Sequence, residues 1–134
     1  MKTCSAYFFS TTINHKDPHI IYLGSSRDTA REWRKNIANS RSFGKEDGKL
    51  CGPITKVSVP APGELGIEKI DKRCPKGMVG GWFCAMTHSG RNGKVVIMCH
   101  SSYVEALKRK TYETNEMNEK CGRIVKRYIP GYKV

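Results

Sequence analysis

The first apolar positions of the chain follow one another as they do in strands. Residues 5–13 are rich in aromatic and β-branched side chains, and residues 20–23 form the short run Ile, Ile, Tyr, Leu. Turn-forming residues stand between the two segments, from Asn14 to Pro18. The pattern therefore predicts an antiparallel hairpin over residues 5–24.

A helical period begins directly after this hairpin, because three apolar residues fall on one face at 100° per residue. These residues are Ala30, Trp33 and Ile37. Thr29 and Glu32 match a capping box and predict the start of the helix, with Asp28 as a second N-cap candidate. The helix is expected to end near residue 39.

The second half of the chain shows the same change from strands to a helix. Apolar runs at residues 82–86 and 95–99 flank an Asn-Gly pair, which is a strong hairpin signal. Ser102 with Glu105 matches another capping box. The apolar period of this second helix fades over residues 114–119, so the helix either ends there or breaks and resumes.

Two further segments complete the predicted fold. Residues 53–59 alternate, with apolar side chains at Ile54, Val57 and Val59, which predicts one more strand. Residues 123–134 are basic and aromatic, and they form either a last strand or an arm. The fold class expected is α+β: one small domain over residues 1–134, with an antiparallel β-sheet, two main helices and a basic tail at residues 120–134.

The charge balance narrows the choice of partners. The sequence has 24 Lys and Arg against 12 Asp and Glu, a net charge of +12, with the excess toward both ends of the chain. Such an excess attracts polyanions, and acidic proteins or anionic surfaces feel the same field. No apolar run is long enough to span a membrane, so no membrane partner is expected.

Six cysteines are scattered without a repeated spacing and without a Cys-x-x-Cys pair. A reduced, cytoplasmic setting is therefore the expectation, with the cysteines acting as small hydrophobic residues. A zinc site from Cys84, His88, Cys99 and His100 would require these residues to meet across a hairpin. Their spacing fits no common ligand pattern.

The hairpin and first helix resemble a known family. Tyr7 in the first strand and Tyr22-Leu23-Gly24-Ser25-Ser26 after the second are similar to the two halves of the GIY-YIG nuclease motif. The resemblance covers the N-terminal third of the chain and implies a GIY-YIG-like endonuclease that depends on a divalent metal such as Mg²⁺. The first half of the motif departs from the family, because Ser5-Ala6-Tyr7 lacks both Gly and Ile.

The resemblance also implies catalytic roles for individual residues. Tyr7 and Tyr22 would help to place or activate water, and Arg31 would hold the scissile phosphate. Glu105 would bind the metal. The family's helix arginine usually lies one position later, where this chain has Glu32, so Arg31 or Arg34 would have to reach the phosphate instead. Packing of both tyrosines on half-buried strands, with Glu105 serving only in the capping box, is the competing interpretation.

Clusters of basic residues are the candidates for phosphate contact. One cluster lies on the first helix and comprises Arg27, Arg31, Arg34 and Lys35. A second lies near the C-terminus and comprises Lys108, Arg109, Lys110, Arg123, Lys126, Arg127 and Lys133. Tyr128 and Tyr132 are interleaved with the second cluster, which suits a single strand whose bases stack on rings. Arg91, at the Asn-Gly hairpin tip, is a further candidate. A solvated surface is the alternative for both clusters.

The sequence therefore predicts a nucleic-acid-binding protein, for DNA or RNA, that contacts phosphates through a basic face. Metal-dependent endonuclease activity is the additional hypothesis, with Mg²⁺ as cofactor only in that case. The alternative is a non-catalytic small basic protein of the phage or mobile-element type, which binds and inhibits a host or partner protein. A structural component of a ribonucleoprotein or virion is a third class.

Overall fold

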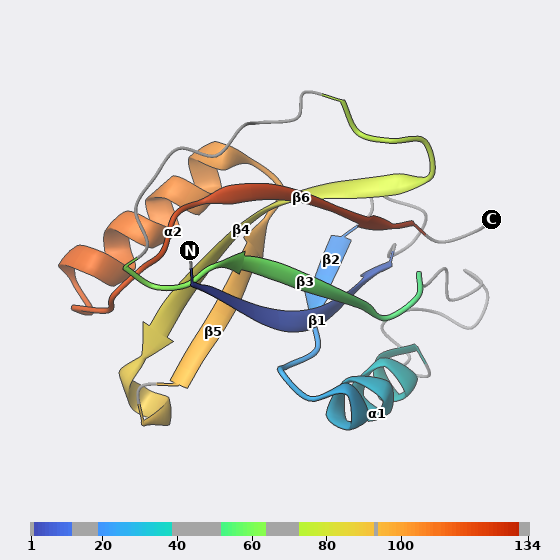
Figure 1. Cartoon of the computed structure of the whole chain (residues 1–134), viewed down its shortest axis with the longest axis horizontal. Helices are drawn as coiled ribbons and strands as arrows, with labels where there is room; N and C mark the ends of the chain where they lie inside the picture. Colours follow the sequence, from blue (N-terminus) through green and yellow to red (C-terminus); the bar gives the residue numbers. More distant parts are fainter. Residues whose placement is uncertain (1, 12–18, 39–51, 64–72, 93, 132–134) are drawn as a thin grey trace.

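The structure, a computed structural model, describes residues 2–11, 19–38, 52–63, 73–92 and 94–131. Within these residues, six strands form two antiparallel three-stranded sheets, and each sheet carries one helix on its outer face (Figure 1). The predicted small α+β domain is thus confirmed. The expected turn at 14–18, residues 42–51 of the loop that the glycine-rich segment 42–52 predicts, and the chain end at 132–134 lie outside the described residues.

The first sheet has the strand order β2-β1-β3. Its central strand is β1 (Thr3–Thr11), flanked by β2 (His19–Tyr22) and β3 (Thr55–Pro60). Phe8 of β1 lies opposite Tyr22 on one side and Thr55 on the other. The antiparallel pairing of the N-terminal hairpin is confirmed, and so is the strand predicted over residues 53–59, which the structure forms as Thr55–Pro60.

The second sheet has the strand order β5-β4-β6. The long strand β4 (Met78–His88) lies between β5 (Lys94–His100) and β6 (Val125–Pro130). The short helix η2 (Ser89–Arg91) joins β4 to β5 and is followed by Asn92 with a left-handed φ of 57°. The predicted Asn-Gly hairpin is confirmed, and within the described part of the C-terminal stretch residues 125–130 form a strand of the sheet.

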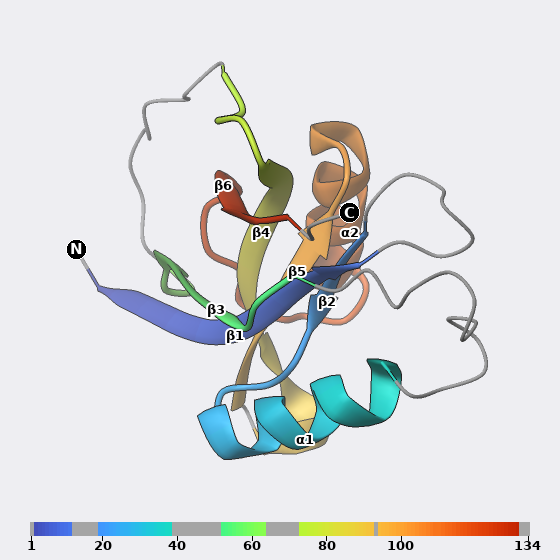
Figure 2. The ribbon, with the colours of Figure 1, turned by 90° about the vertical axis from the view of Figure 1, so that its right-hand side faces the viewer.

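The hydrophobic core fills the space between the two sheets. Because side chains alternate along a strand, every second residue of each central strand points inward. The rings of Phe8 and Phe83 meet edge to face at 5.0 Å, and both side chains are fully buried. Contacts of β2 with β5 and of β3 with β6 bring the sheets together along both edges (Figure 2).

Helix α1 (Arg27–Ala38) covers the outer face of the first sheet (Figure 2). Its N-cap is Ser26, whose hydroxyl oxygen accepts a hydrogen bond from the backbone N–H of Thr29 at 3.5 Å. The N-cap predictions for Asp28 and Thr29 were therefore wrong, because both residues lie inside the first turn, where backbone dihedrals are already helical.

The buried face of α1 also differs from the prediction. Ala30 and Ile37 pack with the hydrophobic cluster above β1, but Trp33 remains 42% exposed. Arg34 takes the position expected of Trp33, with its guanidinium 5.7 Å from the ring centre of Phe9. Positions 34 and 37 lie close to position 30 around the helix axis, so these three side chains form the buried face. Position 33 lies further round the axis, at the border of that face.

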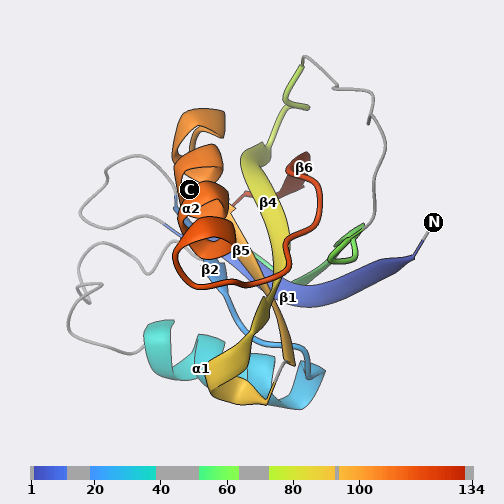
Figure 3. The same cartoon turned by 90° about the vertical axis from the view of Figure 1, so that its left-hand side faces the viewer.

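Helix α2 (Tyr103–Asn115) crosses the outer face of β4 and β5 (Figure 3). The hydroxyl of Ser102 accepts the backbone N–H of Glu105 at 3.2 Å, as the capping-box pattern predicts. The helix ends at Asn115 and does not resume. Instead, the chain returns to the sheet, where Cys121 forms an antiparallel bridge with Met86.

The return of the chain depends on Glu119, which is 7% exposed. Its carboxylate accepts hydrogen bonds from the Thr87 hydroxyl at 2.8 Å and from the backbone N–H of Ser89 at 3.1 Å. These bonds fix the loop after α2 to the end of β4. Among the described residues, no helix combines the length and apolar content needed to cross a membrane.

Candidate nucleic-acid interface

The two motif tyrosines lie on opposite faces of the first sheet. Tyr22 faces the core, where its ring centre is 5.5 Å from that of Phe8. Tyr7 precedes Phe8 in β1, so its side chain points to the other face, where it packs with the cluster of Phe9 and Leu23 beneath α1. Both tyrosines thus pack on half-buried strands.

The other two residues implied by the GIY-YIG resemblance lie apart from each other. Arg31 is exposed on α1, whereas Glu105 is exposed on α2, with its carboxylate 3.7 Å from the Lys108 ammonium. The structure does not bring Tyr7, Tyr22, Arg31 and Glu105 to one face.

The candidate metal ligands are likewise dispersed. In the described part of the chain, no group of three or more His, Cys, Asp or Glu residues is placed to hold a metal ion. Cys84 and Cys99 lie on opposite faces of the second sheet, and burial raises the pKa of each thiol to about 12. Mg²⁺-dependent nuclease activity stays a prediction that the resemblance implies. Nicking of a plasmid that requires Mg²⁺ and disappears in Arg31→Ala would establish this activity.

The basic residues of α1 divide into two kinds. Arg27, Arg31 and Lys35 are exposed to solvent. Arg34 is half-buried, and its Nε donates a hydrogen bond to the carbonyl of Gly52 at 3.0 Å. The helix therefore presents three of its four predicted phosphate contacts, while Arg34 ties α1 to the chain before β3.

The basic residues of α2 and of its surroundings are more varied. Lys108 lies near Glu105, Arg109 donates to Glu113 at 2.9 Å, and Lys110 is half-buried. Exposed ion pairs of this kind contribute little to stability, so the cations remain accessible to an anionic ligand. The side chain of Arg91 lies outside the described residues.

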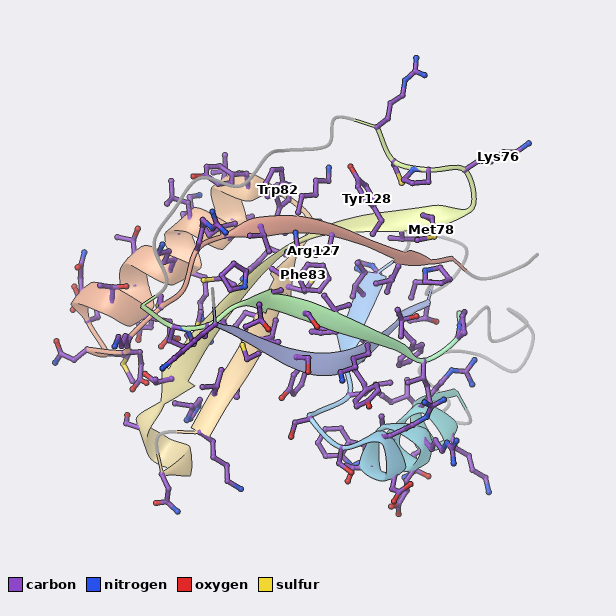
Figure 4. All side chains as sticks on the ribbon, viewed as in Figure 1. Lys76, Met78, Trp82, Phe83, Arg127 and Tyr128 are labelled. Atoms are coloured by element: carbon purple, nitrogen blue, oxygen red, sulfur yellow. The ribbon has the colours of Figure 1, made fainter. Side chains whose placement is uncertain are left out.

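The predicted cations on and next to β6 have different roles. Arg123 is half-buried before the strand begins. Arg127 points toward β3, and its Nε donates to the carbonyl of Ser58 at 3.1 Å, which joins the two sheets (Figure 4). Lys126 points to the opposite, outer face, where it meets two aromatic rings.

Four side chains on the outer face of the second sheet form what we call the aromatic ladder: Tyr103, Trp82, Lys126 and Tyr128. The Lys126 ammonium lies 5.2 Å from the ring centre of Trp82 and 5.7 Å from that of Tyr128. Trp82 also meets Tyr103 edge to face at 5.2 Å. Figure 4 shows Trp82 and Tyr128 on the same side of the β4–β6 pair, with Met78 beside them.

The strand register explains why these residues meet. Trp82 lies opposite Lys126, and Gly80 lies opposite Tyr128, so both cross-strand pairs belong to the outer face of the β4–β6 pair. A Cβ at Gly80 would lie 3.0 Å from the Tyr128 ring and 3.1 Å from Lys126 Cε. Glycine therefore leaves the room in which the Tyr128 ring and the lysine stem lie close to the strand.

Sequence reasoning found half of the ladder. Lys126 and Tyr128 belong to the predicted C-terminal cluster, whereas Trp82 and Tyr103 were not singled out. The glycine pair before Trp82 was the available signal, since glycine in a strand marks close approach of another group. No protein-family model, curated protein or solved structure matches this chain.

Proposed function

We propose that the protein binds single-stranded nucleic acid, DNA or RNA, on the outer face of the second sheet. Lys126 between Trp82 and Tyr128 is the observation that carries this proposal, because it combines a cation with stacking surfaces. Single-strand binding surfaces join these same two elements: positive charge follows the phosphates, and rings stack on the bases. The net charge of +12 supports a polyanionic ligand.

Stacking of nucleic-acid bases on the rings is stronger than the cation–π contacts that Lys126 makes with the same rings. A cation–π contact at a partly exposed site contributes about 0.5–1 kcal/mol. Stacking of a base on an aromatic side chain contributes about 1–3 kcal/mol. Lys126 has a flexible stem, so its ammonium is able to move to a phosphate and leave the ring faces of Trp82 and Tyr128 to the bases.

Further side chains extend the surface beyond the ladder. Tyr103 is 46% exposed at the start of α2. Lys76 is exposed in the segment just before β4, where Figure 4 shows its side chain pointing outward. Tyr103 therefore extends the aromatic surface, and Lys76 adds a cation near the beginning of β4. Duplex bases are already stacked on one another, so a duplex offers this surface only its phosphates.

Fluorescence anisotropy with labelled single strands and the matching duplex tests the proposal. The expected result is tighter binding of the single strand, with an affinity that falls steeply between about 50 and 200 mM salt. Absence of binding in dilute buffer, or equal affinity for the single-stranded oligonucleotide and the duplex, would overturn the proposal. Salt-insensitive binding to one protein would instead support the inhibitor function.

A further inference from the structure

Most of the large apolar side chains that are exposed in the described part of the chain lie on α2 or directly after it. Five of the seven are found there, with exposed fractions between 44% and 59%: Tyr103, Val104, Leu107, Tyr112 and Met117. The helix packs on β4 and β5 through its buried residue Ala106. It therefore buries one side and leaves an apolar surface at the margin of the molecule (Figure 1). Exposed apolar patches of this kind mark sites of interaction with another molecule.

A groove of about 470 Å³ runs along the outer side of α2. Its walls are two rows of side chains in which neighbours are four residues apart: Val104, Lys108, Tyr112 and Glu116 in the first row, and Leu107 and Thr111 in the second. Residues four apart form the ridges of a helix surface, and the groove between two ridges receives a ridge of a second helix. The outer side of α2 thus has the relief on which another helix packs.

The first row is complementary in charge to its own reversed copy. Tyr112 is its centre, Lys108 stands four residues before it, and Glu116 stands four residues after it. If a second copy lies antiparallel on the groove, Lys108 of each chain comes beside Glu116 of the other, and the two Tyr112 rings meet. A two-fold axis generates this arrangement. The contact of Lys108 with Glu105 at 3.7 Å leaves 72% of the lysine side chain exposed, so its ammonium is accessible to a second chain.

The charge of α2 differs from that of the chain as a whole. Residues 105–116 contain three Lys or Arg and three Glu, whereas the net charge of the chain is +12. The surplus that attracts a polyanion therefore comes from other segments. A neutral surface with a self-complementary row is suited to a second copy of this chain, because the two copies meet there with little repulsion.

We infer that the outer side of α2 is an interface between two copies of this chain, which pair antiparallel about a two-fold axis. A helix of 13 residues is about 20 Å long, and one pair of such helices buries less than the roughly 1,200 Å² of a standard stable interface. The dimer is therefore weak and reversible. It should form at about 100 μM and above and dissociate at about 10 μM and below. The inference does not depend on the proposed function.

Sedimentation equilibrium between about 10 μM and 1 mM tests the inference, at about 0.15 M salt to screen the net charge beyond about 8 Å. The wild-type chain should change from monomer to dimer. Lys108→Glu and Glu116→Lys should each raise the Kd by about tenfold or more, because each change brings like charges together at two symmetric places. These two changes shift the net charge in opposite directions, so a general charge effect cannot explain weakening by both. A wild-type chain that stays monomeric at about 1 mM, or singly changed chains that dimerise as tightly as wild type, would overturn the inference.

The double variant Lys108→Glu/Glu116→Lys tests the antiparallel pairing. It exchanges the two charged ends of the row and should restore the wild-type Kd. A parallel pair would match each position with itself, so the single changes would leave its Kd unaltered. Glu32→Lys and Lys35→Glu, at exposed sites of α1, are the matched controls and should leave the dimer unchanged. A double variant as weak as the single ones, or controls that weaken the dimer as much, would overturn the inference.

Discussion

The ammonium group of Lys126 lies 5.2 Å from the ring centre of Trp82, on the strand directly across from it. The two residues come from distant parts of the sequence, and β5 and α2 lie between them along the chain. Their pairing places a cation and an aromatic ring on one surface of the second sheet. That surface, with Tyr128 and Tyr103, is the basis for the proposed single-strand binding.

Loss of the aromatic rings should weaken binding of single-stranded nucleic acid. Trp82→Leu and Tyr128→Leu keep an apolar side chain but remove the stacking surface. If each ring stacks on one base, each change should reduce affinity between about 5-fold and 150-fold, which corresponds to about 1–3 kcal/mol. Fluorescence anisotropy measures the loss. Trp33→Leu is the control, because Trp33 is exposed on α1, on the outer face of the other sheet. Equal effects of the Trp33 and Trp82 changes would contradict the assignment of the surface.

Removal of the ladder cation should change the salt dependence of binding. For single strands, log K falls with log salt by about 0.7 for each phosphate contact. Lys126→Gln should therefore make the slope shallower by about 0.7. Lys35→Gln removes the same charge from an exposed site on α1, away from the second sheet, and serves as the matched control. An unchanged slope in Lys126→Gln would show that this ammonium does not contact a phosphate.

Deletion of the ring between the sheets should destabilise the fold. Phe83 is fully buried and packs edge to face against Phe8. Phe83→Ala removes the ring and leaves a cavity, which should lower the free energy of unfolding by about 3–5 kcal/mol. Urea denaturation measures the change. Tyr112→Ala, at a side chain that is 51% exposed on α2, should cost less than about 0.5 kcal/mol. A loss at Phe83 as small as that at Tyr112 would contradict the placement of the core.

Acid should weaken the contact between the loop after α2 and the second sheet. Hydrogen bonds from Ser89 and Thr87 hold the pKa of Glu119 below its ordinary value. Because the folded pKa lies below the unfolded one, the carboxylate stabilises the fold at pH values above the unfolded pKa. This stabilisation is lost as the pH falls through the folded pKa.

The thermal midpoint of unfolding between about pH 6 and pH 3 tests this linkage. Glu119→Gln should flatten the profile and lower the midpoint most at the upper end of this range. Glu116→Gln, with an exposed side chain after the end of α2, should leave the profile unchanged. Identical profiles for the wild-type protein and Glu119→Gln would refute the linkage.

Local patterns in the sequence predicted the secondary structure well. Alternation and the Asn-Gly signal identified the strands, and Ser102 identified the start of α2, because these features depend on residues close together in the chain. The start and packing face of α1 were mispredicted. Ser26 was passed over in favour of Asp28 and Thr29. Trp33 was placed on the buried face because it is apolar and shares the helical period of Ala30 and Ile37, although Arg34 lies over the Phe9 ring instead.

The candidate site could be predicted only in part, because it depends on pairings between distant segments. Lys126 and Tyr128 alternate on one strand and were visible as a basic and aromatic cluster. Their contact with Trp82 requires the register of β6 against β4, which no local pattern specifies. Arg127 lies between them on the same strand, so its side chain points to the opposite face, where it donates a hydrogen bond to the Ser58 carbonyl.

Tryptophan fluorescence tests the central claim most directly. The chain contains two tryptophans, so Trp33→Phe leaves Trp82 as the single emitter. Titration of this variant with a single-stranded oligonucleotide should quench the Trp82 emission as bases stack on the ring, and added salt should restore it. A strand that binds, as shown by anisotropy, without any change in Trp82 emission would contradict binding at the aromatic ladder.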